Sequence, residues 1–114
     1  MDIDQLRDIC LSLPAVTEDV KWDHDLCFSV AGKMFCVIAL DPPFKASFKV
    51  TDDEFEELSS TEGFMPAAYM ARAKWVTVTD PSHLNKKEWE HYIRQSFELV
   101  KAKIPKKTLK ELGI

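Results

Sequence analysis

The chain has 114 residues, of which 46% are hydrophobic and 30% are charged, and its formal net charge is −4. This composition is ordinary for one globular domain, residues 1–114, which is long enough to bury a core without a metal or disulfide staple. No apolar run approaches the roughly 20 residues of a membrane span, and three scattered glycines exclude a Gly-rich phosphate loop. The acidic N-terminus is unlike a signal peptide, so we expect a cytoplasmic protein. We also favour a monomer.

A helix is predicted over residues 3–13. Asp2 can cap this helix together with Gln5 three residues later, and apolar residues recur along it at helical spacing. Pro14 ends the helix, and we expect a polar loop to follow as far as the first strand.

Three strands are predicted next. Residues 26–31 and 34–40 are expected to form a hairpin with a tight turn between them. The second of these strands is apolar on both faces, which indicates a central position in the sheet. Two consecutive prolines mark a turn at 41–44, and polar and apolar residues then alternate in the strand 45–50.

The second half of the chain begins with a helix after the capping residue Thr51. We then expect a short helix at 67–71, a strand at 74–79 and a long amphipathic helix at 86–104 that Pro105 ends. Together these elements predict an α+β fold, in which an antiparallel sheet packs against N- and C-terminal helices.

The three cysteines are odd in number, so they cannot all pair within the chain. Cys27 and Cys36 fall on neighbouring predicted strands, but none of the three lies in a C-x-x-C motif. We therefore expect reduced, buried thiols.

No residue pattern in the chain indicates a chemical reaction. His24, His83 and His91 are isolated, and the acids at 52–57 fit a helix cap and a solvated helix face better than an iron site. No serine or cysteine lies in a nucleophile motif. We therefore predict a non-enzymatic protein without metal or cofactor, and an enzyme whose site is assembled from distant residues stays an alternative.

Positive charge is concentrated in the second half of the chain. Residues 1–62 carry 14 acids and 5 bases, whereas residues 63–114 carry 5 acids and 10 bases. Such a local excess can attract an anionic partner even when the whole protein is acidic. The candidate phosphate-binding residues come from both halves: Lys33, Lys45, Lys49, Arg72 and Lys74, with Trp75 packing or stacking beside them.

Short motifs recur in a particular order along nearly the whole chain. They are Leu13-Pro14-Ala15, Trp22, Val30-x-Gly32-Lys33-Met34-Phe35, Ser47-Phe48-Lys49, Pro66 through Tyr69, Lys74-Trp75-Val76-Thr77-Val78, Ser96-Phe97 and Ile104-Pro105-Lys106-Lys107. In this order and spacing they resemble the MmcQ/YjbR family, small bacterial proteins with a CyaY-like fold.

The resemblance implies a double-wing arrangement, in which hairpins project as wings, and a DNA-binding role that is proposed for the family. The wings would be the 26–40 hairpin, with Lys33 at its tip, and the strand pair around Pro42-Pro43. Lys49 and the 72–75 segment would line the floor between them. Because the protein is acidic overall, either the acids at 52–57 face away from the DNA, or binding is weak and strongly salt-dependent. The likeness to frataxin-type folds also raises iron binding, although the first helix has few acids.

Two hypotheses from different classes follow. The first is a non-enzymatic protein that binds nucleic acid through phosphate contacts, without strong sequence readout. The second is a module that binds a protein or a small ligand in a pocket lined by Trp22, Tyr69 and Trp75. The two hypotheses differ in whether the basic residues or the aromatic residues share one surface.

Overall fold

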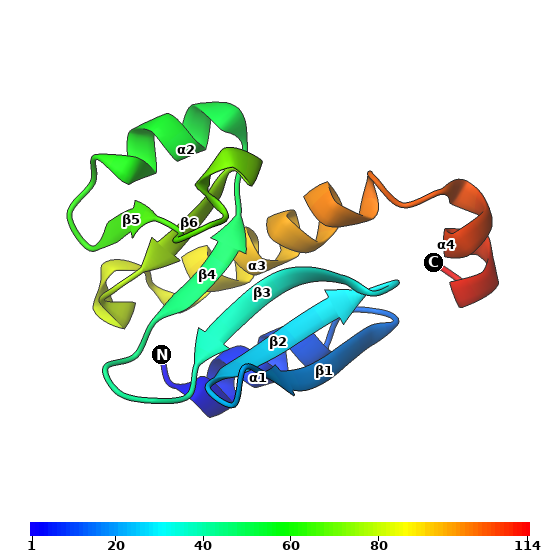
Figure 1. The fold of residues 1–114 in the computed structure, drawn as a ribbon, viewed down its shortest axis with the longest axis horizontal. Coiled ribbons are helices and arrows are strands. Elements are labelled where there is room, and N and C mark those ends of the chain that lie inside the picture. Colours follow the sequence, from blue (N-terminus) through cyan, green and yellow to red (C-terminus); the bar gives the residue numbers. More distant parts are fainter.

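Six strands form one antiparallel sheet in the spatial order β1-β2-β3-β4-β6-β5 in the computed structural model, which describes residues 1–114. The strands are β1 (Val16–Lys21), β2 (Asp25–Val30), β3 (Lys33–Ala39), β4 (Ala46–Lys49), β5 (Phe64–Pro66) and β6 (Trp75–Val78). The helices are α1 (Ile3–Leu11), α2 (Asp52–Ser59), α3 (Lys86–Lys101) and α4 (Lys106–Leu112), with single 3₁₀ turns η1 (Ala71–Ala73) and η2 (Pro81–His83). Figure 1 shows α1 and α3 behind the sheet, and α4 projecting beyond its end. The predicted α+β fold is confirmed.

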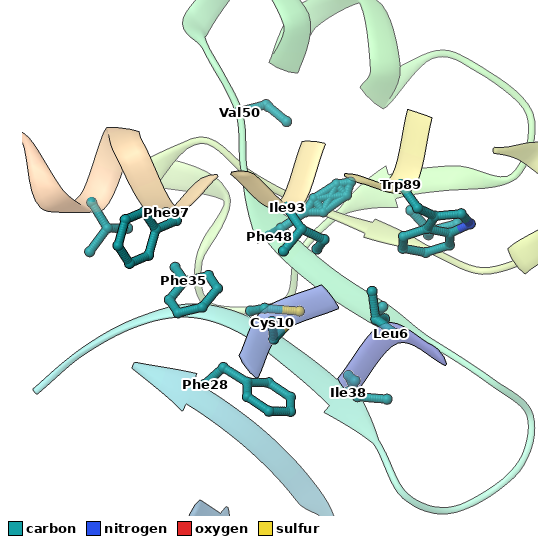
Figure 2. Packing of buried hydrophobic residues seen from close by; sticks show 14 of the residues in the cluster. Leu6, Cys10, Phe28, Phe35, Ile38, Phe48, Val50, Trp89, Ile93 and Phe97 are labelled. Carbon is teal, nitrogen blue, oxygen red and sulfur yellow. The ribbon is translucent and has the colours of Figure 1, made fainter. Parts of the chain in front are cut away.

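The hydrophobic core lies between the sheet and the helices α1 and α3. Figure 2 shows Trp89, Ile93 and Phe97 of α3 on one side of the core, with side chains of the central strands facing them. The rings of Phe35 and Phe97 meet edge to face, with 5.4 Å between their centroids. Edge-to-face contact is a favourable geometry for an aromatic pair, and here it joins α3 to β3.

The predicted helix starts are confirmed, since α1, α2 and α3 each begin with a capping box. In α1, for example, the Asp2 carboxylate accepts a hydrogen bond from the Gln5 amide, and the Gln5 side chain accepts one from the Asp2 amide. Each box satisfies backbone donors that the first turn of a helix leaves free.

Strand β1 occupies a segment that the sequence predicts as a loop. It pairs with β2 along its whole length, from Val16 opposite Val30 to Lys21 opposite Asp25. As an edge strand it buries little, and its polar residues hide the alternation by which a strand is usually recognised. An ion pair between Glu18 and Arg7 of α1, with 2.6 Å between the charged atoms, joins this edge to the helix layer.

Two further elements differ from the sequence prediction. Residues 64–66 form the short strand β5, and the segment predicted as a short helix at 67–71 is a turn that leads into η1. The last long helix ends at Lys101 rather than at residue 104, and Pro105 is the N-cap residue of the additional helix α4. A proline is tolerated at a helix start because its missing amide would be unpaired there. The longest helix has only 16 residues, and no helix has the length and apolar character to cross a bilayer.

The three cysteines are free and buried, as predicted. A hydrogen bond with the Cys10 thiol, together with complete burial, raises the pKa of the Cys36 thiol, and burial raises the pKa of the Cys27 thiol. Because the thiolate is the reactive form, we expect the native protein to react negligibly with Ellman's reagent. In the urea-unfolded protein all three cysteines should react, each releasing one equivalent of the reagent's coloured thiolate. Fast reaction of the native protein would contradict the packing described here.

Candidate nucleic-acid interface

The central strands β3 and β4 separate part-way along the sheet. Their pairing covers only residues 36–38 and 46–48. Beyond it, the hydroxyl of the buried residue Ser96 in α3 donates to the Phe35 carbonyl at 2.6 Å and accepts from the Lys49 amide at 2.9 Å. Figure 1 shows β3 and β4 diverging, with the later part of α3, drawn in orange, visible in the opening. The single sheet therefore opens between the half β1-β2-β3 and the half β4-β6-β5, and α3 lies behind this opening.

Lysines gather at the β4 side of this opening. The Lys49 ammonium donates to the Ala73 carbonyl at the end of η1. Partial burial lowers the pKa of Lys49, and so do the positive charges of Lys103 and Lys74, whereas Asp52 acts in the opposite direction. We refer to Lys49, Lys74 and Lys103 as the lysine cluster. The positive charges of Lys74 and Lys103 make it less favourable for Lys49 to be charged, and a bound anion would offset this repulsion.

Neighbouring side chains hold the cluster in place. Lys74 ends η1 in the left-handed conformation, with φ of 64°, and its ammonium lies 5.0 Å from the centroid of the Phe55 ring in α2. A lysine over an aromatic face keeps its charge while its position is restricted. Arg72 lies two residues earlier, in η1, and is exposed. Of the predicted phosphate-binding residues, the structure therefore brings together Lys49 and Lys74, and Arg72 lies in the same loop as Lys74.

The two remaining lysines of the predicted set lie at opposite ends of β3. Lys33 is exposed at the start of this strand. Lys45 lies beside its other end, because the Ala39 amide donates to the Lys45 carbonyl at 2.9 Å. Seven strand residues at about 3.3 Å each place the two lysines about 20 Å apart. Only a ligand as long as an oligonucleotide would reach both.

Trp75 has a packing position and cannot stack on a ligand. Its side chain is only 4% exposed, and it lies directly opposite Lys49 in the pairing of β4 with β6. A stacking surface requires an open ring face. Of the two roles predicted for Trp75, the structure is compatible with packing beside the lysine cluster.

The aromatic residues of the alternative pocket are not brought together. Trp22 is 65% exposed in the turn between β1 and β2, Tyr69 is fully exposed between β5 and β6, and Trp75 is buried. Strands β3 and β4 separate β2 from β6, a distance of about 14 Å. Two surface hollows instead lie between α1 and α3; one has a volume of about 170 Å³ and is lined by Ile9, Ser12, Leu13, Glu90 and Arg94.

The acids of α2 do not all face away from the lysine cluster. Asp52, in the first turn of α2, is close enough to Lys49 that its negative charge partly offsets the lowering of the Lys49 pKa. Glu54 caps the helix and accepts a hydrogen bond from Gln95 of α3, and these hydrogen bonds help to keep the pKa of Glu54 low despite its partial burial. No group of three or more His, Cys, Asp or Glu side chains is arranged to hold a metal ion.

Sequence reasoning missed one residue of this surface, Lys103, and predicted a different role for Tyr69. Lys103 is not among the residues predicted to bind phosphate, yet its positive charge acts on Lys49, which lies 54 positions earlier in the chain. Tyr69 was assigned to a pocket, yet its ring is open to solvent. No local pattern distinguishes an exposed tyrosine from a buried one in a turn, so only the folded chain reveals either fact.

The comparisons with known proteins agree with this architecture. A sequence model of the YjbR family matches residues 11–99, from within α1 to within α3. The chain belongs to the YjbR family. The resemblance noted from the sequence motifs is thereby confirmed.

A solved structure supports the fold of this YjbR-family protein. The crystal structure of a Pseudomonas syringae protein, determined by a structural genomics consortium, matches with a TM-score of 0.72. The match covers 88% of this chain and 99% of that one, at 21% sequence identity. At this identity the likeness concerns the fold alone. No curated protein matches the chain.

Proposed function

We propose that this YjbR-family protein binds nucleic acid through its phosphates at the lysine cluster, as a binding module without a catalytic step. The observation that carries the proposal is that Lys49 and Lys74 lie on neighbouring strand ends, where Lys49 pairs with Trp75 and the Val50 amide donates to the Lys74 carbonyl at 2.9 Å. Lys103 is close enough for its charge to act on Lys49. A bound phosphate would offset the repulsion among these ammonium groups. Phosphate contacts also fix a nucleic acid on a protein without reading its sequence.

The surrounding charges favour a salt-sensitive interaction of moderate strength. Arg72, two residues before Lys74, adds an exposed positive charge to the same loop, whereas Asp52 and the overall charge of −4 oppose an anion. The local excess of positive charge is therefore limited to a few side chains, and we expect a contact of about four phosphates rather than an extended footprint.

Fluorescence anisotropy with a labelled single-stranded oligonucleotide tests the proposal. Four phosphate contacts predict that the logarithm of the association constant falls with the logarithm of the salt concentration with a slope of about −2.8. A peptide nucleic acid of the same sequence, which keeps the bases but lacks the phosphates, is the control and should not bind. If neither single-stranded nor duplex DNA binds at about 50 mM salt, the proposal is wrong.

A further inference from the structure

Tyr69 is exposed to an extent that is unusual for an aromatic residue. Its relative accessibility is 106%, so nothing in the folded chain covers the ring. Single exposed apolar residues are common, but Tyr69 also has a φ of 65°, in the left-handed region. Bulky residues rarely adopt this conformation, because the side chain crowds the following carbonyl. Both the ring and the backbone of Tyr69 are therefore in positions that folding alone does not favour.

The local turn requires this backbone but does not require a tyrosine. The Met70 amide donates to the Ala67 carbonyl at 3.1 Å, which closes a four-residue turn with Tyr69 in the third position. Turns with a positive φ at that position usually have glycine or asparagine there. A tyrosine in this place gives the turn no packing in return for its strain.

The turn is joined to the lysine cluster by a short series of hydrogen bonds. The Met70 carbonyl accepts from the amides of Ala73 and Trp75, at 3.1 and 3.3 Å. The Ala73 carbonyl in turn accepts from the Lys49 ammonium. Arg72 lies in the same loop, three residues after Tyr69. The open tyrosine ring therefore stands on a loop whose hydrogen bonds connect it to Lys49.

Trp22 has the same two features in a different electrostatic setting. Its φ is 54° and it is 65% exposed, at the turn between β1 and β2. This turn lies among carboxylates, including Asp19, Asp23 and Asp25 in the sequence and Asp41, which binds His24 at 2.9 Å. These charges disfavour a polyanion near Trp22, so charge singles out Tyr69 as the aromatic residue that can accompany phosphate contacts.

We propose that Tyr69 stacks on an unpaired base, and that the ligand of the lysine cluster is therefore single-stranded nucleic acid. This inference rests on the function proposed above and adds the strand class. Stacking suits every base, because each has a flat π face, and it needs no sequence-specific contact. In a duplex the faces of the bases are covered by their neighbours, so a ring fixed outside the groove finds no partner there.

The variant Tyr69→Asn separates the stacking role from the folding role. Asparagine adopts a positive φ more readily than tyrosine, so we expect the melting temperature to rise by about 4 °C. Loss of one stacked base should weaken binding of a dT12 oligonucleotide about tenfold in an anisotropy titration. Stability and affinity would thus change in opposite directions, a result that a merely structural tyrosine would not give.

Two controls make the result specific. An abasic oligonucleotide of the same length keeps the phosphates, so it should bind the native protein and the variant equally. Trp22→Asn changes an exposed aromatic residue at a positive φ in the acidic region, so it should leave dT12 binding unchanged.

Other results would overturn the inference in distinguishable ways. If dT12 and the abasic strand bind equally well and Tyr69→Asn has no effect, phosphate binding stands but the stacking role is wrong. Preference for a duplex over dT12 would also refute the stacking role. If Tyr69→Asn alters only self-association in sedimentation, Tyr69 is a protein contact and the inference fails. Absence of binding to every oligonucleotide would instead refute the proposed function itself.

Discussion

Replacing both Lys49 and Lys74 by glutamate is expected to weaken oligonucleotide binding about 100-fold at low salt. A hydrogen bond to a charged group contributes about 1.5–3 kcal/mol, so each lost phosphate contact costs at least about tenfold. The salt slope of binding to a single strand should also become shallower by about 1.4, since each contact contributes about 0.7. Anisotropy titrations at several salt concentrations measure both changes.

A matched control variant changes the same amount of charge elsewhere. Lys86 and Lys87 are exposed in the first turn of α3, at the opposite end of that helix from Lys103 and about 24 Å away. Their double replacement by glutamate lowers the net charge equally and suits the positive end of the helix dipole. If this control weakens binding as much as the Lys49 and Lys74 variant, the protein responds to net charge and the lysine cluster is not the site.

Replacing Ser96 by alanine is expected to destabilise the fold by about 2–4 kcal/mol. The Ser96 hydroxyl is the hydrogen-bond partner of the Phe35 carbonyl and the Lys49 amide, at the point where the two strands have ceased to pair. Its removal leaves two backbone groups without that partner in an interior where each unsatisfied group costs about 1–3 kcal/mol. Urea unfolding followed by circular dichroism gives the free energy of unfolding for comparison with the native protein.

Ser59 offers the control for this measurement. Its hydroxyl oxygen is buried and has no hydrogen-bond partner, so Ser59→Ala removes a polar group without breaking a contact. We expect this variant to be as stable as the native protein or slightly more stable. Equal stability of Ser96→Ala and Ser59→Ala would show that the bridge between β3 and β4 does not hold the half-sheets in place.

Much of the fold could be predicted because its signals are local. Capping pairs such as Thr51 with Glu54 lie three residues apart, and the apolar face of α3 repeats at helical spacing. Alternation along β4 likewise predicted that Ala46 and Phe48 are buried. These patterns predict the structure correctly because a short segment contains both the residues that cap a helix and the apolar face that must be buried.

The elements that were missed depend on neighbours distant in sequence. Strand β1 has four exposed residues among six, and it is a strand because β2 offers it a partner. Strand β5 has only three residues and depends in the same way on β6. An edge strand forms because it hydrogen-bonds to its neighbour, and it need not bury one face. Its sequence therefore lacks the alternation of polar and apolar residues that identifies a buried strand.

The sequence by itself determined the α+β class, the helix starts, the central position of β3, the buried thiols and the family. The tertiary structure decided which charges and rings meet. It placed Lys103 near Lys49, set Lys33 and Lys45 at opposite ends of β3, buried Trp75 and left Tyr69 open. The reason is physical: capping and periodicity act over a few residues, whereas a binding surface depends on where separate strands and helices pack.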